Sequence, residues 1–349
     1  MLKKAVVILF ACVLILFSCA GQGAVLKGAM PAWVNDAYSA YPKSQYVAAT
    51  GFGPNRTAAE ANALSALTSF FGQTVEIDRS AASSYRQAII NGVMEGWADT
   101  AEMKTNLRTT SSMDNLMGAE IKEVWFDSKD TYYAVAVMEK AKGIQIYGDL
   151  MKVNQNIISN LVTMTPAEKN TMEGVLRFRF AAVVSDINVT YRNIIVLLGR
   201  RADNAAAGDF YRLEAQNIIK LIPVHIRITN DRNGRLFSAF AKCFTDWGFE
   251  TVSTAAPASL PRYALDVNLA LSPVTLPGNQ NVFSRIELTA NFTDTSNNQV
   301  LFPYSFISRE GHTTQAEADN RCILAAERNI GEQFAALLSD YLTQLKPKK

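Results

Sequence analysis

Cysteine and histidine, which supply many nucleophiles, bases and metal ligands, are scarce in this sequence. The 349 residues include four cysteines and two histidines. Cys12 and Cys19 lie in the apolar N-terminal segment, whereas Cys243 and Cys322 lie in the last third of the chain. This distribution limits metal, redox and general-base chemistry. It directs attention to thiol modification at the N-terminus and to disulfide formation near the C-terminus.

The N-terminal segment is typical of a secretory signal peptide. Residues 1–4 include two lysines, and residues 5–17 form an unbroken apolar run that is shorter than a membrane-spanning helix. The run ends in Leu16-Phe17-Ser18-Cys19, which resembles a bacterial lipobox, although Phe17 departs from the small residue usual at its position. The sequence therefore predicts a signal peptide over residues 1–18 and a diacylglycerol on the thiol of Cys19, which becomes the mature N-terminus.

Two alternatives to lipidation of Cys19 stay open. Residues 9–12 have the same spacing and end in Cys12, but little apolar sequence precedes them. Ordinary signal-peptidase cleavage near Ala20 would instead release a soluble product. If Cys19 is modified, two or three acyl chains hold the protein on a bilayer, because each buried methylene group contributes about 0.8 kcal/mol. Residues 19–30 are small and polar with glycines, which predicts a flexible tether.

Cys243 and Cys322 fall on two helices of a predicted C-terminal domain. If both helices cover the same face of a sheet and bring their Cα atoms within about 7 Å, the thiols could form a disulfide in an oxidising compartment. Two separate buried thiols are the alternative.

The sequence carries no complete motif for catalysis, cofactor binding or metal binding. Residues 51–53 (Gly-Phe-Gly) lack the third glycine and the Lys-Ser/Thr of a phosphate loop. Residues 231–234 (Asp-Arg-Asn-Gly) begin like a calcium loop, but the later carboxylate is absent, so a turn is predicted. His225 is predicted in a strand and His312 in a polar loop, without the spacing of a metal site or of a serine hydrolase. We therefore predict no catalytic residue, no cofactor and no metal.

The composition predicts a folded chain of two domains. Hydrophobic residues make up 48% of the sequence, which suffices for more than one core in a chain of this length. Lysine and arginine number 34 against 32 aspartates and glutamates, giving a net charge of +2. Such a small net charge does not favour nucleic acid or acidic lipid as a partner.

Residues 46–71 predict a strand, a glycine turn and a capped helix. The apolar run 46–50 is expected to end at Gly51 and Gly53. Residues 57–60 (Thr-Ala-Ala-Glu) form a capping box that would start the helix at Thr57. The pattern Thr-x-Ala-Glu-Ala recurs at residues 314–318, which favours two domains built alike, with chance recurrence as the alternative. The apolar stripe of the first helix is predicted to contain Ala61, Leu64, Leu67 or Thr68, Phe71 and Val75.

The next segments complete a small α+β domain over residues 31–142. Alternation predicts a strand at 74–80, and helical spacing predicts a helix at 82–101. Strands are predicted at 121–126 and 132–138, joined by a polar hairpin turn. The aromatic residues between Trp33 and Tyr46 are expected to pack at an edge of this domain rather than to form a binding strip.

The order of these segments resembles the LPP-twenty lipoprotein family. The resemblance rests on Pro31-Ala32-Trp33-Val34, on residues 41–42 and 46–53, on the alanine-rich helix, and on Trp125 with residues 132–138. Thr50 departs from the apolar residue usual in that family. The family groups small outer-membrane lipoproteins, and its fold also occurs in the N-terminal part of flagellar assembly protein T. The resemblance covers about the first third of the mature chain and implies an envelope protein with no catalytic residues.

Residues 143–218 are predicted to form an antiparallel helical hairpin. Residues 165–168 (Thr-Pro-Ala-Glu) are a further capping box, with proline at the first helical position. The hairpin would be a spacer or docking arm, or would only pack on its neighbouring domains. One predicted stripe contains Leu150, Val153, Ile157 and Leu161, and the other contains Leu176, Phe180, Val183, Ile187, Tyr191, Ile194 and Leu198.

Residues 219–349 are predicted to form a second α+β domain. The expected elements are a strand at 223–229, a helix ending at Gly248, strands at 263–271, 284–292 and 300–308, and a closing helix at 316–345. This order resembles the domain shared by the N-terminal part of the Tol translocation protein B, the middle of flagellar assembly protein T and the curli-secretion lipoprotein.

Together these observations predict an α+β protein in which two small sheet-and-helix domains are joined by a helical hairpin. We expect a lipid-anchored cell-envelope protein, held by acyl chains on Cys19 and located in the outer membrane. Its expected role is structural or adaptor-like, with other envelope proteins as partners and no nucleic acid. An accessory subunit of a flagellar or secretion assembly and an unrecognised hydrolase are the alternatives. The oligomeric state is not predicted.

Overall fold

The chain folds into two compact units that share two long helices. The structure is a computed structural model, and it describes residues 25–26, 28–74, 79–111, 116–127, 129–201, 207–231, 233–253, 261–278 and 280–344. Unit 1 comprises Met1–Asn156 and Asp186–Ala206, and unit 2 comprises Ile157–Ser185 and Ala207–Lys349. The division passes through α6 (Lys140–Val162) and α8 (Met172–Leu197). The segment 143–218, predicted as a separate hairpin, therefore contributes to both units.

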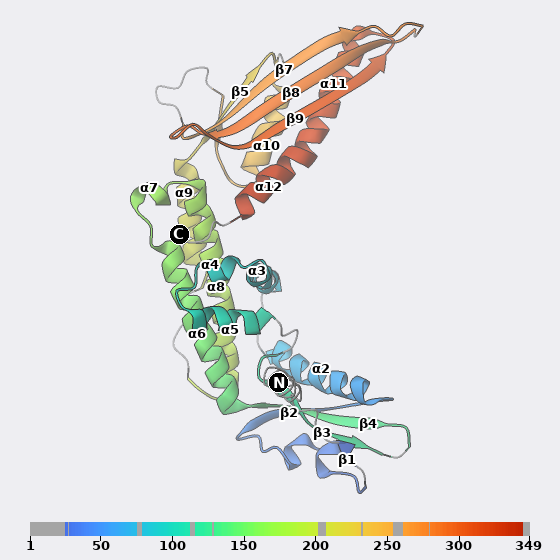
Figure 1. The fold of residues 1–349 in the computed structure, drawn as a ribbon, viewed down its shortest axis with the longest axis vertical. Helices are drawn as coiled ribbons and strands as arrows, with labels where there is room; N and C mark the ends of the chain where they lie inside the picture. The colour runs from blue at the N-terminus through green and yellow to red at the C-terminus, as the bar shows by residue number, and fades with distance from the viewer. Residues whose placement is uncertain are drawn as a thin grey trace, which may run out of the picture. The chain divides into compact units, whose positions relative to one another are not determined.

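Unit 1 contains a four-stranded sheet in the order β1-β3-β4-β2. The strands are β1 (Val25–Leu26), β2 (Tyr46–Gly53), β3 (Ala119–Phe126) and β4 (Tyr132–Glu139). Strand β4 pairs antiparallel with both β2 and β3, and β1 pairs parallel with β3. Helix α2 (Arg56–Thr74) covers one face (Figure 1). The short helices η1 (Ala32–Val34) and η2 (Ala37–Ser39) belong to a segment that packs on the other.

Burial on both faces explains the sequence of β4. Its residues 134–138 are all fully buried, which is typical of a strand covered on two sides. Val135 and Val137 belong to a core with Trp33 and Ala48. The aromatic segment at residues 31–46 thus covers a sheet face, rather than only an edge as predicted.

Gly51 and Gly53 do not end β2, which corrects the prediction. The strand continues to Gly53, with Gly51 opposite Ala134 and Gly53 opposite Tyr132. A Cβ atom at Gly51 would lie 2.1 Å from the amide nitrogen of Ala63, and one at Gly53 would lie 2.7 Å from the Cβ of Ala58. The glycines are therefore required because the α2 backbone approaches the strand closely.

The cap of α2 also differs from the prediction. Asn55 Oδ1 accepts a hydrogen bond from Ala58 N at 2.9 Å, and the helix begins at Arg56. Glu60 pairs with Arg56 at 2.7 Å instead of closing a capping box with Thr57. The buried stripe repeats every fourth residue, so Leu67 and Phe71 are correctly predicted, Leu64 is half-buried and Ala61 is exposed. Val75 lies outside the described residues. The buried residues of the stripe are Ala59, Ala63, Leu67 and Phe71.

Three helices follow where a strand and one helix were predicted. They are α3 (Arg79–Ile90), α4 (Val93–Gly96) and α5 (Ala101–Ser111). The strand predicted at 74–80 is wrong at its described ends, because α2 reaches Thr74 and α3 begins at Arg79. The predicted helix 82–101 is interrupted at Gly92, whose φ of +71° is left-handed.

The hairpin helices are closely packed, and all four residues of the predicted stripe on α6 are buried. The capping box at Thr165 is confirmed, but it starts only the short α7 (Pro166–Lys169), and α8 begins at Met172.

By length and composition α8 could cross a membrane, yet 56% of its most apolar 18-residue window is buried inside the protein. In unit 2, Arg177 donates hydrogen bonds to the carbonyls of Asn160, Leu161 and Thr163. These bonds provide donors for carbonyl groups at the C-terminal end of α6.

A buried polar network ties three helices together within unit 1. Tyr85 OH donates to Asn154 Oδ1 at 2.6 Å, and Asn154 Nδ2 donates to Asn188 Oδ1 at 2.9 Å. These residues come from α3, α6 and α8. Because each buried partner satisfies the next, the network favours one register of the helices.

Unit 2 contains a five-stranded sheet in the order β6-β5-β7-β8-β9. Strands β5, β6 and β7 are parallel, whereas β7, β8 and β9 are antiparallel. Helices α10, α11 and α12 lie on one face of the sheet, as Figure 1 shows. The elements are α9 (Asp209–Leu221), β5 (Val224–Thr229), α10 (Arg235–Thr245), β6 (Thr251–Val252), β7 (Tyr263–Val274), β8 (Val282–Asp294), β9 (Gln299–His312), α11 (Gln315–Asn329), the π-helical η3 (Ile330–Phe334) and α12 (Ala335–Thr343).

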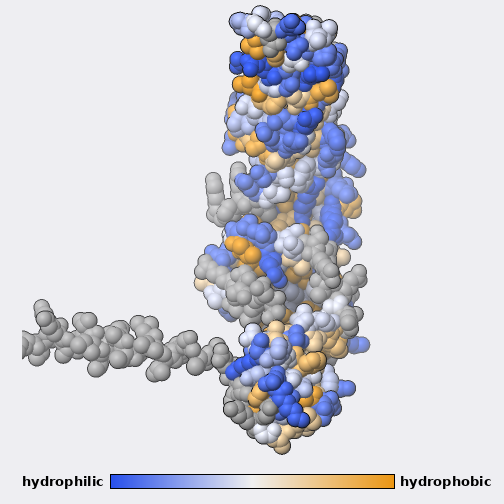
Figure 2. Space-filling view, turned by 90° about the vertical axis from the view of Figure 1, so that its right-hand side faces the viewer, coloured by the Kyte–Doolittle hydropathy of each residue, from blue (hydrophilic) through white to orange (hydrophobic). Residues whose placement is uncertain are grey.

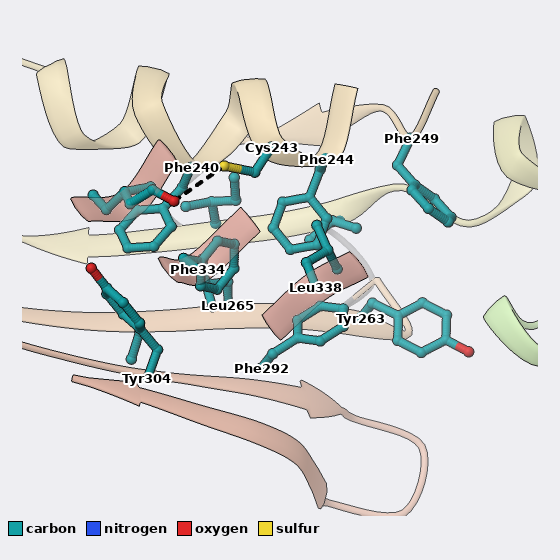
Figure 3. Packing of buried hydrophobic residues seen from close by; sticks show 14 of the residues in the cluster. Phe240, Cys243, Phe244, Phe249, Tyr263, Leu265, Phe292, Tyr304, Phe334 and Leu338 are labelled. Carbon is teal, nitrogen blue, oxygen red and sulfur yellow. Dashed lines mark hydrogen bonds between the residues drawn. The ribbon is translucent and has the colours of Figure 1, made fainter. Parts of the chain in front are cut away.

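Aromatic side chains fill the core between this sheet and its helices (Figure 3). The centroid of the Phe334 ring lies 4.8 Å from the centroid of the Phe240 ring and 5.8 Å from that of the Phe244 ring. Phe244 in turn lies 5.2 Å from Phe292 on β8. The α+β class predicted from the sequence is confirmed, as are the strands predicted within β5, β7, β8 and β9.

Candidate functional site

The cysteine predicted to carry lipid lies outside the described residues, as does its rival Cys12. The first described residues, Val25 and Leu26, form β1 and pair with Val124 and Trp125. Trp125 Nε1 also donates to the carbonyl of Gly28 at 3.3 Å. Val25 and Leu26 lie within residues 19–30, so the prediction of a flexible tether is wrong at these two residues, which are joined to the sheet of unit 1.

The structure places Cys243 on α10 and Cys322 on α11 as two buried free thiols. Cys243 Sγ faces the carbonyl of Ile330 at 3.8 Å, the contact drawn as a dashed line in Figure 3. Cys322 Sγ faces the carbonyl of Ser284 at 3.1 Å. Burial raises the pKa of Cys243 to about 11 and also raises the pKa of Cys322. Both thiols therefore stay protonated at neutral pH and are poor nucleophiles.

The two histidines are far apart in the fold. His225 is fully buried in β5, whereas His312 ends β9, where its Nδ1 accepts from Thr314 N at 3.4 Å. Within the part of the chain that the structure describes, no group of three or more histidine, cysteine, aspartate or glutamate side chains could hold a metal ion.

A carboxylate joins the aromatic segment of unit 1 to its sheet. Glu123 Oε2 accepts from Trp33 Nε1 at 2.8 Å, and Glu123 Oε1 accepts from Tyr41 OH at 2.7 Å. Burial, and then the bond to Glu123, raises the pKa of Tyr41 above its ordinary value. Sequence analysis did not select Glu123, because its partners lie more than 80 residues earlier in the chain.

A polar pocket of about 400 Å³ lies in unit 2, where β5 ends and α10 and α11 begin. Such positions at the carboxyl ends of parallel strands often bind ligands. Asn230, at a left-handed φ of 67°, donates to the carbonyl of Leu269, and Asp231 Oδ2 accepts from Phe237 N at 2.9 Å and so caps α10. The turn predicted at residues 231–234 is therefore one wall of this pocket. The lining residues are Asn230, Asp231, Asn233, Arg235, Leu269, Leu271, Ala316, Asp319, Asn320 and Ile323.

Most charged side chains of the pocket already form ion pairs or hydrogen bonds with neighbouring side chains. Arg235 donates to both oxygens of Glu327 at 2.7 and 2.5 Å, which raises the pKa of the guanidinium group, and to Asn320 Oδ1 at 2.8 Å. Asp319 accepts from Ser284 and Gln315. Because Glu327 balances Arg235, Asp231 and Asp319 leave the lining negative. The pocket can therefore accept hydrogen-bond donors or a cationic group.

The sheet face opposite α10 and α11 is polar and carries a shallow depression of about 390 Å³. Arg227 on β5 and Asp266 on β7 form a bidentate ion pair there, and the distance from Nη2 to Oδ2 is 2.6 Å. Both side chains are about half exposed, so the pair contributes at most about 1 kcal/mol to stability. On the side seen in Figure 2, hydrophobic residues reach the coloured surface as separate patches between hydrophilic ones.

Comparison with known proteins shows no match to any family model and no similar curated protein. Solved structures with partial likeness are of bacterial secreted proteins and lipoproteins. A secreted protein of Helicobacter pylori is 12% identical over 82% of this chain and 98% of its own, with a TM-score of 0.41. A minor lipoprotein of Acinetobacter baumannii is 13% identical over 35% of this chain and 90% of its own, with a TM-score of 0.24. A lipoprotein of Neisseria meningitidis is 10% identical over 35% of this chain and all of its own, with a TM-score of 0.21. At these TM-scores the likenesses carry no argument about function, and the resemblance to the LPP-twenty family stays a prediction.

Proposed function

We propose that this protein is a bacterial cell-envelope protein anchored in the outer membrane by acyl chains on Cys19, with a structural or adaptor role. The lipobox-like residues 16–19 support the anchor, and the pairing of β1 with β3 supports the position of unit 1 beside it. Residues 20–24 are the only ones between Cys19 and this strand, so a lipid on Cys19 would hold unit 1 close to the membrane.

The adaptor role rests on unit 2, which offers surfaces for binding. Its polar sheet face and its pocket at the ends of the strands are both accessible and both lined by amide and charged side chains. Other envelope proteins are the proposed partners. A non-enzymatic role agrees with the chemistry of the thiols, whose pKa values burial raises. In the pocket of unit 2, the two carboxylates that a hydrolase could use are those of Asp231 and Asp319, and each of these already accepts structural hydrogen bonds.

Metabolic labelling with a palmitate analogue tests the proposal. We expect wild-type protein to be labelled, Cys19→Ser to lose the label, and Cys12→Ser to keep it. Label retained in Cys19→Ser, or lost in Cys12→Ser, would contradict lipidation at Cys19.

A second candidate is an accessory subunit of a large envelope assembly, and the edge strand β9 favours it. This strand ends the order of the sheet and exposes 48% of Val300 and 63% of Ile307. An exposed edge offers unpaired backbone groups to another chain. A photo-crosslinker at Ile307 should capture a component of the assembly in cells, and a crosslinker at Ser65 on α2 should not. Recovery of the monomer alone from both positions would count against this candidate.

A further inference from the structure

One row of large side chains crosses the whole sheet of unit 1. The register places Leu26, Trp125, Tyr133 and Phe52 opposite one another on β1, β3, β4 and β2. Residues paired across strands lie on the same face of a sheet. The centroid of the Tyr133 ring lies 5.4 Å from the centroid of the Trp125 ring and 6.3 Å from that of the Phe52 ring. We call these four residues the aromatic row.

The aromatic row faces away from α2. In the neighbouring row Gly51 is opposite Ala134, and Gly51 is the residue that the α2 backbone approaches. Because successive residues of a strand alternate between faces, Phe52 and Tyr133 lie on the other side.

The outer parts of the aromatic row are exposed. The segment at residues 31–46 covers the adjacent positions Val135 and Val137 and reaches Trp125, which is only 7% exposed. In contrast, 67% of Phe52 and 39% of Leu26 are exposed. The row is therefore an apolar, mostly aromatic surface with a buried centre and open ends.

The proximity of Cys19 indicates what covers this surface. Cys19 and Val25 are separated by six peptide units, which span at most about 20 Å when extended. Leu26 is the next residue and belongs to the row itself. An acylated Cys19 would therefore hold a bilayer within this distance of the row at all times, which raises the effective concentration of the membrane at the surface.

Resting on the proposed lipid anchor, we propose that the aromatic row lies on the membrane surface and forms a second, non-covalent contact with the bilayer. The contact is made by the exposed side chains of Phe52 and Leu26, which are apolar, and by the half-buried Tyr133, whose ring combines an apolar face with a hydroxyl group suited to the level of the lipid headgroups. The turn next to the row carries Asp127, Lys129 and Asp130, so its net charge is negative and does not attract anionic lipid. The contact therefore depends on burial of apolar surface, and it persists at high salt.

A spin label at the exposed end of the row tests the proposal. The acylated mature protein with Phe52→Cys would be labelled and reconstituted into vesicles of phosphatidylethanolamine and phosphatidylglycerol. Cys243 and Cys322 are buried, so the label is directed to the new cysteine. We expect this label to lose accessibility to a water-soluble nickel chelate and to gain accessibility to oxygen. Ser65→Cys, at an exposed position of α2, is the matched control and should keep its accessibility to the chelate.

The outcomes separate this proposal from the lipid anchor. Intact mass of the same sample establishes whether Cys19 carries lipid. If lipid is present and the label at position 52 stays accessible to the chelate, the row does not contact the bilayer and the proposal is overturned while the anchor stands. If lipid is absent, both proposals fall. Spin–spin broadening would instead place a second copy of the chain on the row and would also overturn the proposal. Leu26→Cys, at the other end of the row, should behave as Phe52→Cys does and covers the case in which Phe52→Cys fails to fold.

Discussion

At the scale of single residues, the Glu123 side chain has the largest structural role that we can assign in unit 1. Its two oxygens accept from Trp33 and Tyr41, which come from the segment that covers one face of the sheet. Trp33 is only 2% exposed, so its indole nitrogen has little access to water. The carboxylate thus determines where an aromatic segment without regular strands or long helices lies.

Replacing Glu123 should destabilise unit 1 far more than replacing a neighbouring carboxylate. Glu123→Ala leaves two partly buried donors without an acceptor, which we expect to cost about 2 to 4 kcal/mol of unfolding free energy. Glu120→Ala is the matched control, because Glu120 pairs with Lys122 at the surface and its loss should cost less than about 1 kcal/mol. Urea unfolding followed by tryptophan fluorescence measures both. Equal losses in the two variants would contradict the role assigned to Glu123.

The two C-terminal thiols should remain separate. Each Sγ faces a different backbone carbonyl, and burial raises the pKa of both thiols. We expect the denatured, lipidated protein to incorporate two alkyl groups without reductant, and the native protein to react slowly. A denatured protein that incorporates alkyl groups only after reduction would instead reveal the disulfide between Cys243 and Cys322.

At the scale of elements, the contact between α2 and β2 depends on the absence of side chains at Gly51 and Gly53. Gly51→Ala would place a Cβ 2.1 Å from the Ala63 amide nitrogen, so the helix must move away from the sheet. We expect a loss of at least about 2 to 3 kcal/mol in unfolding free energy. Gly72→Ala in the same helix meets no atom within 4 Å, and it should stabilise the protein by about 0.5 to 1 kcal/mol. Thermal unfolding of the two variants checks the expected loss and the expected gain of stability. A Gly51→Ala variant as stable as the wild type would contradict the close packing of α2.

The sequence predicted most elements of the fold because periodicity survives in long segments. The strands predicted within β3, β4, β5, β7, β8 and β9 and the buried stripe of α6 all follow from alternation or helical spacing. Strand β6 has only two residues and so has no periodicity to detect. Gly51 was misread because glycine can mark either the end of a strand or a close approach, and only the position of α2 distinguishes the two. The cap was misplaced because Asn55 competes with Thr57 two residues later.

At the scale of the whole molecule, buried tyrosines should make the protein less stable at alkaline pH. Burial raises the pKa of Tyr85, Tyr147 and Tyr191 above the ordinary value of 10.0. The folded state therefore keeps these phenols protonated, whereas the unfolded state releases their protons near pH 10. The stabilisation is fully present below about pH 10 and is lost as the pH rises further.

We therefore expect the urea midpoint to fall steeply above about pH 10. Absorbance at the phenolate band should show that the buried tyrosines ionise only as the protein unfolds. If all 12 tyrosines of the chain ionised together near pH 10 with the fold intact, this account of the cores would be wrong.

The surfaces proposed to bind partners or the membrane could not be predicted from the sequence. The pocket of unit 2 combines residues 230–235 with residues 316–323, and nothing in either segment alone distinguishes it from a turn and a helix start. The aromatic row needs the register of four strands that come from three separate parts of the chain. In contrast, the predicted lipid site at Cys19 depends only on local sequence.

The most direct test of the account is the intact mass of the N-terminal peptide of the mature protein, purified from membranes of cells that express the full chain. The account predicts a peptide that begins at Cys19 and carries the mass of a diacylglycerol, with or without a further acyl chain on the amino group. A mature chain that begins at Ala20 or elsewhere and carries no lipid mass would contradict it.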